Sequence, residues 1–461
     1  MNGTTTLRVP RHIFRQYDIR GRVADELTEE VTARVGQAFA NECVSQRTNT
    51  VLVAGDVRLS TESLRNALTN GLRLGGANVL DLGVAPTPLL YFATEHFQHS
   101  AGIVITGSHN PPEFNGLKFV LNYIPFAGED LQALYETINT NSLTTDSGTR
   151  ASADVIEPYI KRVLEDVKVH RPIRLGIDCG NGVTGVLGPR LFEEIGCEVH
   201  AVHSTPDGTF PNHHPDPVKP ENLRDLIKLV RSRDLDVGIA FDGDGDRLGV
   251  VTRKGEIVSA DILMSYFAYD ILQEHPGADF IFDVKCGSTL PTTITSLGGC
   301  PVMWKTGHTN IKQKIRELEA PLGGEFSGHI CFADRWYGFD DALYSAARLV
   351  ELISQDTQEL DDFLQSIPER FSTPEIEVPT TDERKFAIID ELRKRGSFGR
   401  GRVLTVDGLR VDYEDSWGLI RASNTTANLT MRFEATSGAA LKRVKNTFLS
   451  QLKRVAPDLI H

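Results

Sequence analysis

The sequence predicts an α/β protein with three similar mixed-sheet α/β domains and a smaller C-terminal α+β domain. Three observations support this fold class. Short apolar runs alternate with longer amphipathic stretches, a weak repeat recurs at about the length of a domain, and the pattern changes in the last part of the chain. A chain of 461 residues is long enough for three or four such domains.

The apolar runs are short and bounded by Gly, Asp and Asn, as expected for strands of a buried sheet. They cover residues 51–54, 103–105, 173–177, 237–241 and 280–282. Amphipathic stretches with a helical period lie between them, for example residues 62–74 and 221–233. The alternation of the two patterns predicts α/β units throughout the first three quarters of the chain.

A weak repeat relates three segments of the chain. In each segment an apolar run ends in an acidic residue, and these residues are Asp56, Asp178 and Asp283. A polar, glycine-rich loop follows later in each segment, at residues 106–110, 242–247 and 323–329. Open α/β sheets bind ligands at loops that follow the carboxyl ends of their strands. We therefore expect three similar domains that each contribute one loop to a shared cleft.

The last part of the chain differs from the rest. Residues 373–379 contain Pro and Glu and are typical of a connection, and residues 402–407, 408–413 and 429–433 alternate as strands do. A helical pattern covers residues 438–453. We predict a smaller α+β domain here. The predicted domain boundaries are 1–153, 154–256, 257–368 and 369–461.

The composition excludes several classes of function. The net charge is −13 and no basic stripe is present, so a nucleic-acid partner is not expected. The first residues lack the apolar segment of a signal peptide, and no apolar run approaches the length of a membrane span. The cysteines form no Cys-x-x-Cys pair, which favours reduced thiols. We expect a cytoplasmic protein without a membrane partner.

The loop at residues 242–247 predicts a metal site. Asp242, Asp244 and Asp246 are separated by single glycines, which allows three carboxylates to converge on one hard cation. A solvated acidic turn is the alternative, but carboxylates this close repel one another without a cation. An EF-hand calcium loop is excluded, because its glycine and glutamate positions hold Arg247 and Arg253. Three protein oxygens leave room for a phosphate, which favours Mg²⁺.

Ser108 follows a predicted strand in the motif Thr-Gly-Ser-His-Asn-Pro-Pro at residues 106–112. The hydrolase elbow is absent, because Thr106 and Asn110 stand at its glycine positions. A serine in such a turn is usually a local hydrogen-bonding residue. The aspartate loop raises a second possibility: Ser108 bears a phosphoryl group, which needs a metal and cations beside it. Ser108 would then join the three aspartates as a metal ligand.

Cations and polar loops complete the candidate site. The cations in glycine-containing loops are Arg20, Lys118 and Arg247. In an extended loop Glu325 and Ser327 would point the same way and bind two adjacent sugar hydroxyls, and His329 could exchange a proton. A capped turn is the alternative. The side chains that could together form a phosphate cup, or else only a polar turn, are Arg421, Ser423, Asn424 and Thr425.

The four loops together resemble those of the α-D-phosphohexomutase family, and within it the bacterial phosphomannomutase/phosphoglucomutase group. The phosphoserine loop is similar at residues 106–112, the metal loop at 242–247, the sugar loop at 324–329 and the phosphate loop at 421–425. Phe326 stands where Met is common in the family, and Ala427 stands where Pro is common. The resemblance extends from residue 17 to residue 434.

The resemblance implies a heart-shaped monomer of four domains around a cleft. It implies a mutase that interconverts hexose 1-phosphate and hexose 6-phosphate, of mannose or glucose, through phospho-Ser108, Mg²⁺ and a hexose 1,6-bisphosphate. Catalytic roles are expected for Ser108, Lys118, Arg247 and His329. The further residues that the resemblance places near the substrate are Tyr17, Arg20, Lys285 and His308.

Other functions remain open from the sequence. A phosphoglucosamine mutase is a near relative, although Gln would then be expected in place of Phe326. A sugar phosphatase would also use Ser108 but would not need the second phosphate site at Arg421. A non-catalytic sugar-phosphate-binding protein would need neither Ser108 nor three metal carboxylates. If Glu325 and Ser327 bind only hydroxyls that glucose and mannose share, the site would accept both sugars.

Overall fold

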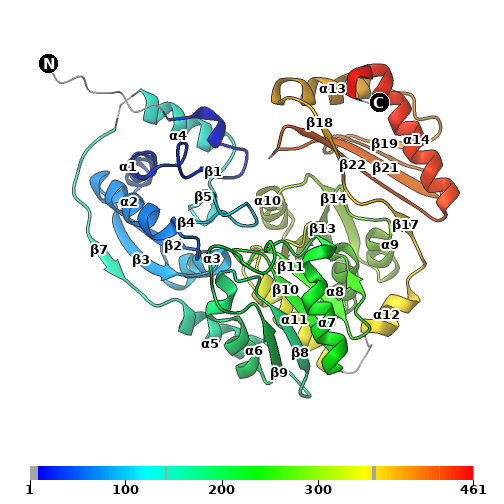
Figure 1. Ribbon diagram of the computed structural model, residues 1–461, viewed down its shortest axis with the longest axis horizontal. Helices are drawn as coiled ribbons and strands as arrows, with labels where there is room; N and C mark the ends of the chain where they lie inside the picture. The colour runs from blue at the N-terminus through cyan, green and yellow to red at the C-terminus, as the bar shows by residue number, and fades with distance from the viewer. Residues whose placement is uncertain (1–8, 141–142, 356–359, 425, 460–461) are drawn as a thin grey trace.

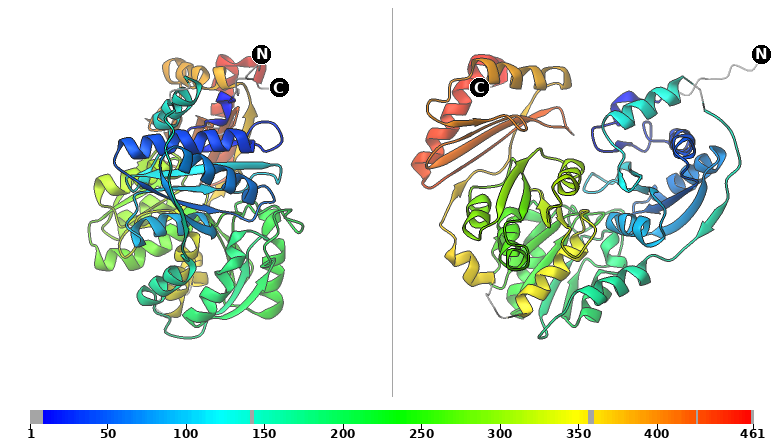
Figure 2. Two further views of the ribbon diagram at one scale, coloured as in Figure 1. Left: turned by 90° about the vertical axis from the view of Figure 1, so that its left-hand side faces the viewer. Right: turned by 180° about the vertical axis from the view of Figure 1, so that it is seen from behind.

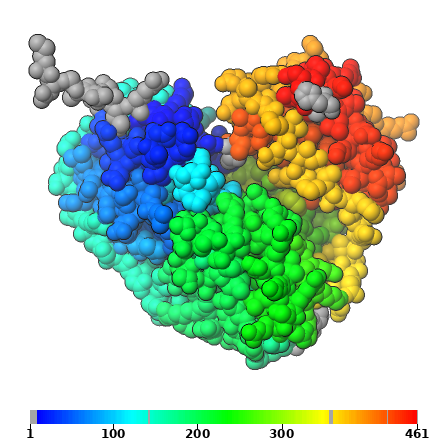
Figure 3. All heavy atoms as spheres, viewed as in Figure 1, coloured from blue at the N-terminus to red at the C-terminus, as the bar shows by residue number. Residues whose placement is uncertain are grey.

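The computed structural model describes residues 9–140, 143–355, 360–424 and 426–459. Within these residues the strands form four sheets, each with its own helices, which we call domains I to IV in chain order (Figure 1). The space-filling view shows the surface hollowed between domain I, in blue, and domain IV, in orange and red (Figure 3). None of the described helices is both long and apolar enough to cross a membrane.

Domain I contains a mixed sheet with helices on both faces. Its strands, in spatial order, are β1 (Ile19–Arg22), β5 (Phe114–Leu121), β4 (Ala101–Ile105), β2 (Thr50–Gly55), β3 (Asn78–Val84) and β7 (Arg150–Ser152), and β6 (Ile124–Pro125) pairs with β5. Its helices are α1 (Glu29–Ser45), α2 (Thr61–Leu74), α3 (Thr87–His96) and α4 (Glu129–Asn139).

Domain II follows with a sheet ordered β12 (Ile257–Val258), β11 (Leu248–Thr252), β10 (Val237–Phe241), β8 (Arg174–Asp178) and β9 (Glu198–Val202). Its helices are α5 (Ile156–Asp166), α6 (Gly188–Ile195) and α7 (Arg224–Arg233). Domain III orders its strands β14 (Cys300–Trp304), β13 (Asp279–Asp283), β15 (Leu322–Gly324) and β16 (Ile330–Phe332). Its helices are α8 (Ala260–Glu274), α9 (Thr289–Ser296), α10 (His308–Leu318), α11 (Ala342–Ser354) and α12 (Leu360–Ser366).

The weak sequence repeat corresponds to one topology used three times. In each of the first three domains two parallel pairings are followed by one antiparallel pairing: β3–β2–β4–β5, β9–β8–β10–β11 and β14–β13–β15–β16. The three polar loops all connect the last two strands of this unit. The predicted fold class and the shared position of the loops are therefore confirmed.

Domain IV is an antiparallel sheet covered by two helices within the described residues. Its strands are β17 (Phe371–Ser372), β22 (Asn428–Ala435), β21 (Ser416–Ala422), β20 (Leu409–Asp412) and β19 (Arg402–Leu404), and β18 (Ile376–Pro379) pairs with β22. Its helices are α13 (Asp382–Arg395) and α14 (Gly438–Val455). The sequence patterns did not predict β21, because both faces of this strand are buried and its residues do not alternate in polarity.

The buried apolar residues show how the domains are joined. One cluster runs from domain I through domain II into domain III, so these three domains share a core. Domain IV has a core of its own. A small cluster of Val284, Trp417 and Leu419 joins it to domain III. An extended connection leads from α12 to domain IV, as the view from behind shows (Figure 2).

Candidate active site

Ser108 lies in the loop between β4 and β5 and is buried. Its φ is +47°, a conformation that few residues other than glycine adopt. Its Oγ donates a hydrogen bond to Oδ2 of Asp242 at 2.8 Å and lies 3.0 Å from Nδ1 of His109. The loop that carries the predicted phosphoserine therefore touches the loop that carries the predicted metal ligands.

A dense set of hydrogen bonds fixes the serine loop. Asp56, at the end of β2, accepts hydrogen bonds from Oγ1 of Thr106 at 2.8 Å and from the backbone N of Gly107 at 3.1 Å. The guanidinium of Arg58 donates to the carbonyl of Ser108 at 2.7 Å and to three further carbonyls of this segment. A side chain at Gly107 would collide with this guanidinium. The surrounding contacts thus hold Ser108 in its unusual conformation.

The carboxylates of Asp242, Asp244 and Asp246 are fully buried, and an oxygen of each lies within 4.8 Å of the other two. Oδ1 of Asp242 accepts hydrogen bonds from three backbone N–H groups of its own loop. Oδ1 of Asp244 and Oδ1 of Asp246 have no hydrogen-bond partner among the described residues. Buried carboxylate oxygens without a donor are costly, and such oxygens are the ligands that Mg²⁺ takes. The triad therefore fits a divalent cation.

Lys118, on β5, is a buried cation in direct contact with this triad. Its Nζ donates hydrogen bonds to Oδ2 of Asp244 at 2.7 Å and to Oδ2 of Asp246 at 2.5 Å. Burial opposes its charge, but these two carboxylates outweigh burial and raise the pKa of Lys118 well above its usual value. Burial and the same two carboxylates raise the pKa of Asp242 well above its usual value. One ammonium thus leaves the triad with excess negative charge.

A second buried acid, Asp340, organises the histidines on the other side of the triad. Its Oδ2 lies 3.1 Å from Nδ1 of His329 and 3.1 Å from Nδ1 of His308, and its Oδ1 accepts a hydrogen bond from Lys312 at 2.6 Å. Arg247 donates a hydrogen bond from Nε to Nε2 of His329 at 3.0 Å. Because an arginine can only donate, Nδ1 of His329 carries the ring hydrogen toward Asp340.

Two histidines of the site are held in the neutral form. Burial, reinforced by Lys312, lowers the pKa of His308 to about 4. Burial, reinforced by Arg247, lowers the pKa of His109 well below its usual value. The rings of His308 and His329 are stacked with their centroids 5.3 Å apart. The neutral imidazoles of His308 and His109 can accept a hydrogen bond, but they add no resting positive charge.

The predicted extended loop at residues 325–327 is a turn, so that prediction was wrong. The backbone N of Gly328 donates to the carbonyl of Glu325 at 3.1 Å, and Gly328 has a φ of +92° that closes the turn. Glu325 is buried and its Oε1 accepts a hydrogen bond from the backbone N of Gly307 at 2.6 Å, whereas Ser327 is half-buried. Burial raises the pKa of Glu325. The two side chains therefore do not follow the alternation of an extended chain.

The predicted phosphate-binding cations each face a carboxylate. Nε of Arg421, at the end of β21, donates to Oδ2 of Asp407 at 3.0 Å. Nζ of Lys285 lies 2.9 Å from Oε1 of Glu375. Oγ of Ser423 accepts a hydrogen bond from the backbone N of Thr426 at 3.1 Å. Thr425, the last predicted member of this loop, lies outside the described residues.

Tyr17 connects domain I to domains III and IV, whereas Arg20 lies against the serine loop of its own domain. The hydroxyl of Tyr17 donates to the carbonyl of Thr306 at 2.8 Å and accepts a hydrogen bond from Nδ2 of Asn424 at 2.6 Å. Tyr17 thus contacts domains III and IV at once. Arg20 donates from Nη1 to the carbonyl of Gly107 at 2.5 Å, within the serine loop. Its position there places a buried guanidinium beside Ser108.

Sequence reasoning missed several residues of this region. The sequence patterns do not indicate Asp340, Lys312, Asp407 or Glu375, and they mark His109 only as a neighbour of Ser108. These residues stand alone among unrelated neighbours in the sequence, so no spacing marks them. Only Asp340 carries a local signal, because Asp340 and Asp341 form an acidic pair between apolar residues.

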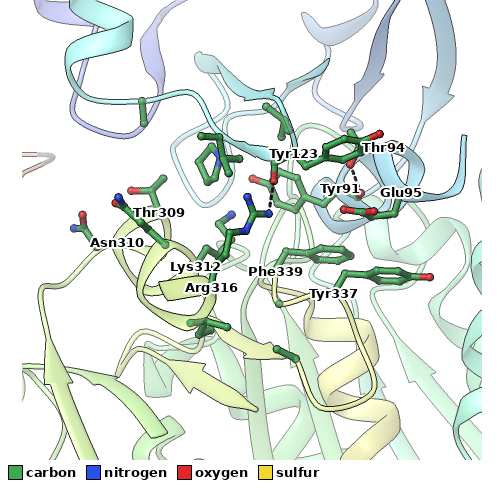
Figure 4. Close-up of a pocket in the computed structure, with 18 of the residues that line it drawn as sticks. Tyr91, Thr94, Glu95, Tyr123, Thr309, Asn310, Lys312, Arg316, Tyr337 and Phe339 are labelled. Atoms are coloured by element: carbon green, nitrogen blue, oxygen red, sulfur yellow. Dashed lines mark hydrogen bonds between the residues drawn. The ribbon is translucent and has the colours of Figure 1, made fainter. Parts of the chain in front are cut away.

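A cavity of about 640 Å³ lies beside the site, between domains I and III (Figure 4). Arg316, from α10, reaches across it and donates a hydrogen bond to the carbonyl of Tyr123 at 2.9 Å. Lys312, which pairs with Asp340, forms part of its wall. None of the site residues predicted from the sequence is among the described residues that line it. The cavity is therefore separate from the reacting groups, although it shares one wall with them.

Models of one protein family match successive segments of the chain. The matches are "Phosphoglucomutase/phosphomannomutase, alpha/beta/alpha domain I" at residues 11–145, domain II at 157–255, domain III at 259–371, and the C-terminal domain at 375–451.

Individual relatives match nearly the whole chain. A phosphomannomutase/phosphoglucomutase of Pseudomonas syringae is 48% identical, over 98% of this chain and 97% of that protein. A phosphoglucomutase of Neisseria meningitidis is 40% identical, over 98% and 99%. The crystal structure of a phosphoglucomutase/phosphomannomutase family protein from Burkholderia thailandensis is 44% identical, with a TM-score of 0.92 over 98% of this chain and 99% of that one.

Proposed function

Because the chain belongs to the phosphoglucomutase/phosphomannomutase family and is a hexose phosphate mutase, we propose that Ser108 carries the phosphoryl group that this mutase transfers. The observation that supports this most directly is the 2.8 Å hydrogen bond from Ser108 to Asp242. It joins the hydroxyl to one of three clustered buried carboxylates, and the other two each have an oxygen without a donor among the described residues. A neutral serine has no need of such surroundings, whereas a phosphoserine with its metal does.

The proposed reaction consists of two phosphoryl transfers. In the first, a free hydroxyl of the hexose monophosphate attacks the phosphorus of phospho-Ser108, the bond from phosphorus to the serine oxygen breaks, and a hexose 1,6-bisphosphate forms. The bisphosphate then turns in the cleft. In the second transfer Ser108 takes the other phosphoryl group, and the product leaves as the isomeric monophosphate. Each transfer releases one proton from the attacking hydroxyl and returns one to the leaving oxygen.

The triad of Asp242, Asp244 and Asp246 would hold Mg²⁺, with an oxygen of phospho-Ser108 as a further ligand. Bound there, Mg²⁺ would offset negative charge on the phosphoryl group. Lys118 and Arg20 supply fixed positive charge at the same place. The raised pKa of Lys118 suits a charge-stabilising role rather than that of a base.

His329 is the proposed acceptor of the hydroxyl proton. Its Nδ1 faces Asp340, and its Nε2 is held by Arg247 at 3.0 Å. When Arg247 turns to a substrate phosphate, Nε2 becomes free to take a proton from the attacking hydroxyl. Asp340 then stabilises the imidazolium that forms, because its carboxylate already accepts the hydrogen on Nδ1.

The non-reacting phosphate would bind at Arg421, Ser423, Asn424 and Thr425, with Lys285 beside them. Glu325 and Ser327, which lie on one turn rather than on an extended loop, would hold the 3- and 4-hydroxyls, which glucose and mannose share. We therefore propose that the enzyme accepts both sugars. Relatives of this chain are named for both activities, as phosphomannomutase/phosphoglucomutase or as phosphoglucomutase.

A mutase assay with intact-mass analysis tests the proposal. The purified protein is incubated with Mg²⁺ and glucose, mannose or glucosamine 1-phosphate, and both 6-phosphate and free phosphate are measured. We expect comparable kcat/KM for the first two sugars, little free phosphate, and one phosphoryl group per chain that disappears in Ser108→Ala. Retention of the group in Ser108→Ala would move the nucleophile elsewhere. A preference of several thousandfold for one of glucose and mannose would overturn dual specificity. Release of stoichiometric free phosphate would overturn the mutase mechanism.

A further inference from the structure

Asp178, His203 and His213 form a cluster in domain II, outside the active site. One ligand atom of each lies within 4.8 Å of those of the other two. Asp178 ends β8, His203 follows β9, and His213 lies in the loop between β9 and α7. We propose that this cluster is a second cation site, selective for a transition metal of the Zn²⁺ class. Such a site is independent of the proposed chemistry at Ser108.

The internal repeat shows that Asp178 is used differently from its counterparts. Asp56 directly follows β2 and Asp283 ends β13, the strands that correspond to β8, and each accepts a backbone N–H from the polar loop of its own domain, at Gly107 and Phe326. Oδ2 of Asp178 instead lies 3.0 Å from Nε2 of His213. Asp56 and Asp283 therefore hold the polar loops of domains I and III, whereas the corresponding Asp178 of domain II faces an imidazole.

Each imidazole of the cluster already has a partner on one ring nitrogen. Nδ1 of His213 lies 3.0 Å from the carbonyl of His214, and Nε2 of His203 lies 2.9 Å from Oδ2 of Asp225. Metal-binding histidines typically donate their other N–H to a carbonyl or a carboxylate in this way, which fixes the tautomer that binds the metal. The ligand atoms would be Nε2 of His213, which faces Oδ2 of Asp178, and Nδ1 of His203.

The hydrogen-bond pattern of His213 leaves a place for a cation. Both of its ring nitrogens face oxygens that can only accept, the carbonyl of His214 and the carboxylate of Asp178. A neutral imidazole has only one N–H and satisfies one of these oxygens, whereas an imidazolium donates to both. The position of Nε2 therefore favours a positive charge between it and Asp178, and a metal bound there would take the place of the second proton. Zinc ligands at about 2.0–2.2 Å from the metal in a tetrahedral site lie roughly 3.3–3.6 Å apart, so Nε2 and Asp178, which are 3.0 Å apart, would separate by only a few tenths of an ångström to admit the metal.

The ligand types distinguish this site from the aspartate triad. Two imidazoles and one carboxylate suit Zn²⁺, whereas three carboxylates suit Mg²⁺. The side chains of His203 and His213 are 17% and 15% exposed, so an ion and a water ligand can reach them, while Asp178 is fully buried. A cell-like excess of Mg²⁺ should therefore fill the triad and leave this cluster to the other metal.

The loop that carries His213 contacts both reactive loops. The ring of Phe210 lies under the guanidinium of Arg58, 5.1 Å from its centroid, and Arg58 holds the serine loop. The carbonyl of Pro215 accepts a hydrogen bond from Gly243 in the metal loop at 3.2 Å, and Asp216 lies 3.9 Å from Arg247. A metal at Asp178, His203 and His213 would anchor this loop, and its role would be structural.

Zinc binding in the presence of Mg²⁺ tests the proposal. The full chain is equilibrated with Zn²⁺ and a large excess of Mg²⁺, and bound zinc is counted by mass spectrometry. We expect one Zn²⁺ per chain that Mg²⁺ does not displace, and a higher thermal midpoint with Zn²⁺. Co²⁺ in its place should give the strong visible bands of tetrahedral coordination. No bound zinc, or zinc that Mg²⁺ displaces, would overturn the second site.

Substituted chains show which residues bind the zinc and separate loss of a ligand from a general loss of structure. His203→Ala should weaken Zn²⁺ binding more than about 100-fold, and Asp225→Asn about 10- to 100-fold, because Asp225 only orients a ligand. His200→Ala is the matched control: this histidine lies on β9, pairs with the exposed Glu198 and is not in the cluster. Its zinc affinity should be unchanged. Equal affinity in His203→Ala and in the unsubstituted chain would contradict the proposal, whatever the mutase activity.

Discussion

The two walls of the cleft differ in charge balance: one has an excess of buried carboxylates, and in the other each cation is paired with a carboxylate. The serine–metal wall, formed by Ser108, Lys118 and the aspartate triad, has three buried carboxylates and one ammonium. In the sugar–phosphate wall, formed by Lys285, Arg421 and Asn424, the two cations each lie against a carboxylate, Glu375 at 2.9 Å and Asp407 at 3.0 Å.

The difference indicates how each wall receives its ligand. The first wall has oxygens without donors among the described residues, so it is complete only with an added cation. The second wall keeps its cations neutralised by the protein, so an arriving phosphate must share or replace a carboxylate partner. Such exchange suits a wall where the substrate binds in two orientations, because no phosphate is held too tightly to leave.

The largest expected effect comes from removing one carboxylate of the serine–metal wall. In Asp244→Asn one carboxylate that lacks a donor for Oδ1 is replaced by an amide, and metal affinity falls with the charge. We expect kcat/KM to fall on the order of 10³-fold, about 4 kcal/mol of transition-state stabilisation. Thr87→Val is the matched control, since it removes only the hydroxyl that donates to Asp244 at 2.5 Å and should cost about tenfold. Titrating Mg²⁺ in the mutase assay measures both; an unchanged Mg²⁺ requirement in Asp244→Asn would refute the metal role.

Removal of a cation from the second wall should cost less. Arg421→Ala loses a charged hydrogen bond to the non-reacting phosphate, worth about 1.5–3 kcal/mol, so kcat/KM should fall roughly 10- to 150-fold. Arg384→Ala, in the same domain, removes an exposed ion pair with Asp458 and should leave the kinetics unchanged. Steady-state kinetics with glucose 1-phosphate compares the two. Similar kinetics in both variants would mean that the phosphate binds elsewhere.

Removing the carboxylate that neutralises Lys285 should have a smaller effect, and it should strengthen substrate binding rather than weaken it. Glu375→Gln removes the charge that neutralises Lys285 but keeps the shape of the side chain. If the carboxylate competes with phosphate, KM should fall about two- to fivefold, equivalent to the 0.5–1 kcal/mol typical of a partly exposed ion pair. An increase in KM would show instead that Glu375 positions Lys285, and that the second wall is pre-formed.

The sequence predicted those parts of the molecule that are encoded locally. The single-glycine spacing of the triad and the motif around Ser108 lie within short segments, and the repeated topology follows from strands marked by their own apolar runs. Asp340 was not predicted, because its partners His308, Lys312 and His329 meet it only after α10 and β16 pack together.

Two further features that the sequence did not predict also depend on backbone geometry and packing. Asp341 caps α11 by accepting a hydrogen bond from the backbone N of Tyr344 at 3.0 Å, and in the sequence Asp340 cannot be told from this cap. The turn at Glu325 depends on the positive φ of Gly328, whereas the sequence was interpreted as an extended loop. Both features are fixed by backbone geometry and packing rather than by side-chain pattern.

The smallest expected effect on the rate concerns His308, which lies where the two walls meet, edge-on to Tyr17 at 5.9 Å. Burial lowers its pKa to about 4 from an ordinary 6.5, so the unfolded chain binds a proton that the folded protein lacks between these values. Stability should therefore rise with pH across this window, by up to about 3 kcal/mol from this group. His308→Asn should flatten the rise of the thermal midpoint between pH 4.5 and 6.5. Above pH 6 the imidazole is already neutral, so the substitution should change kcat/KM by the same factor at every pH in that range. A kinetic ionisation near pH 6.5 that disappears in His308→Asn would instead make this histidine a titrating partner of the reaction.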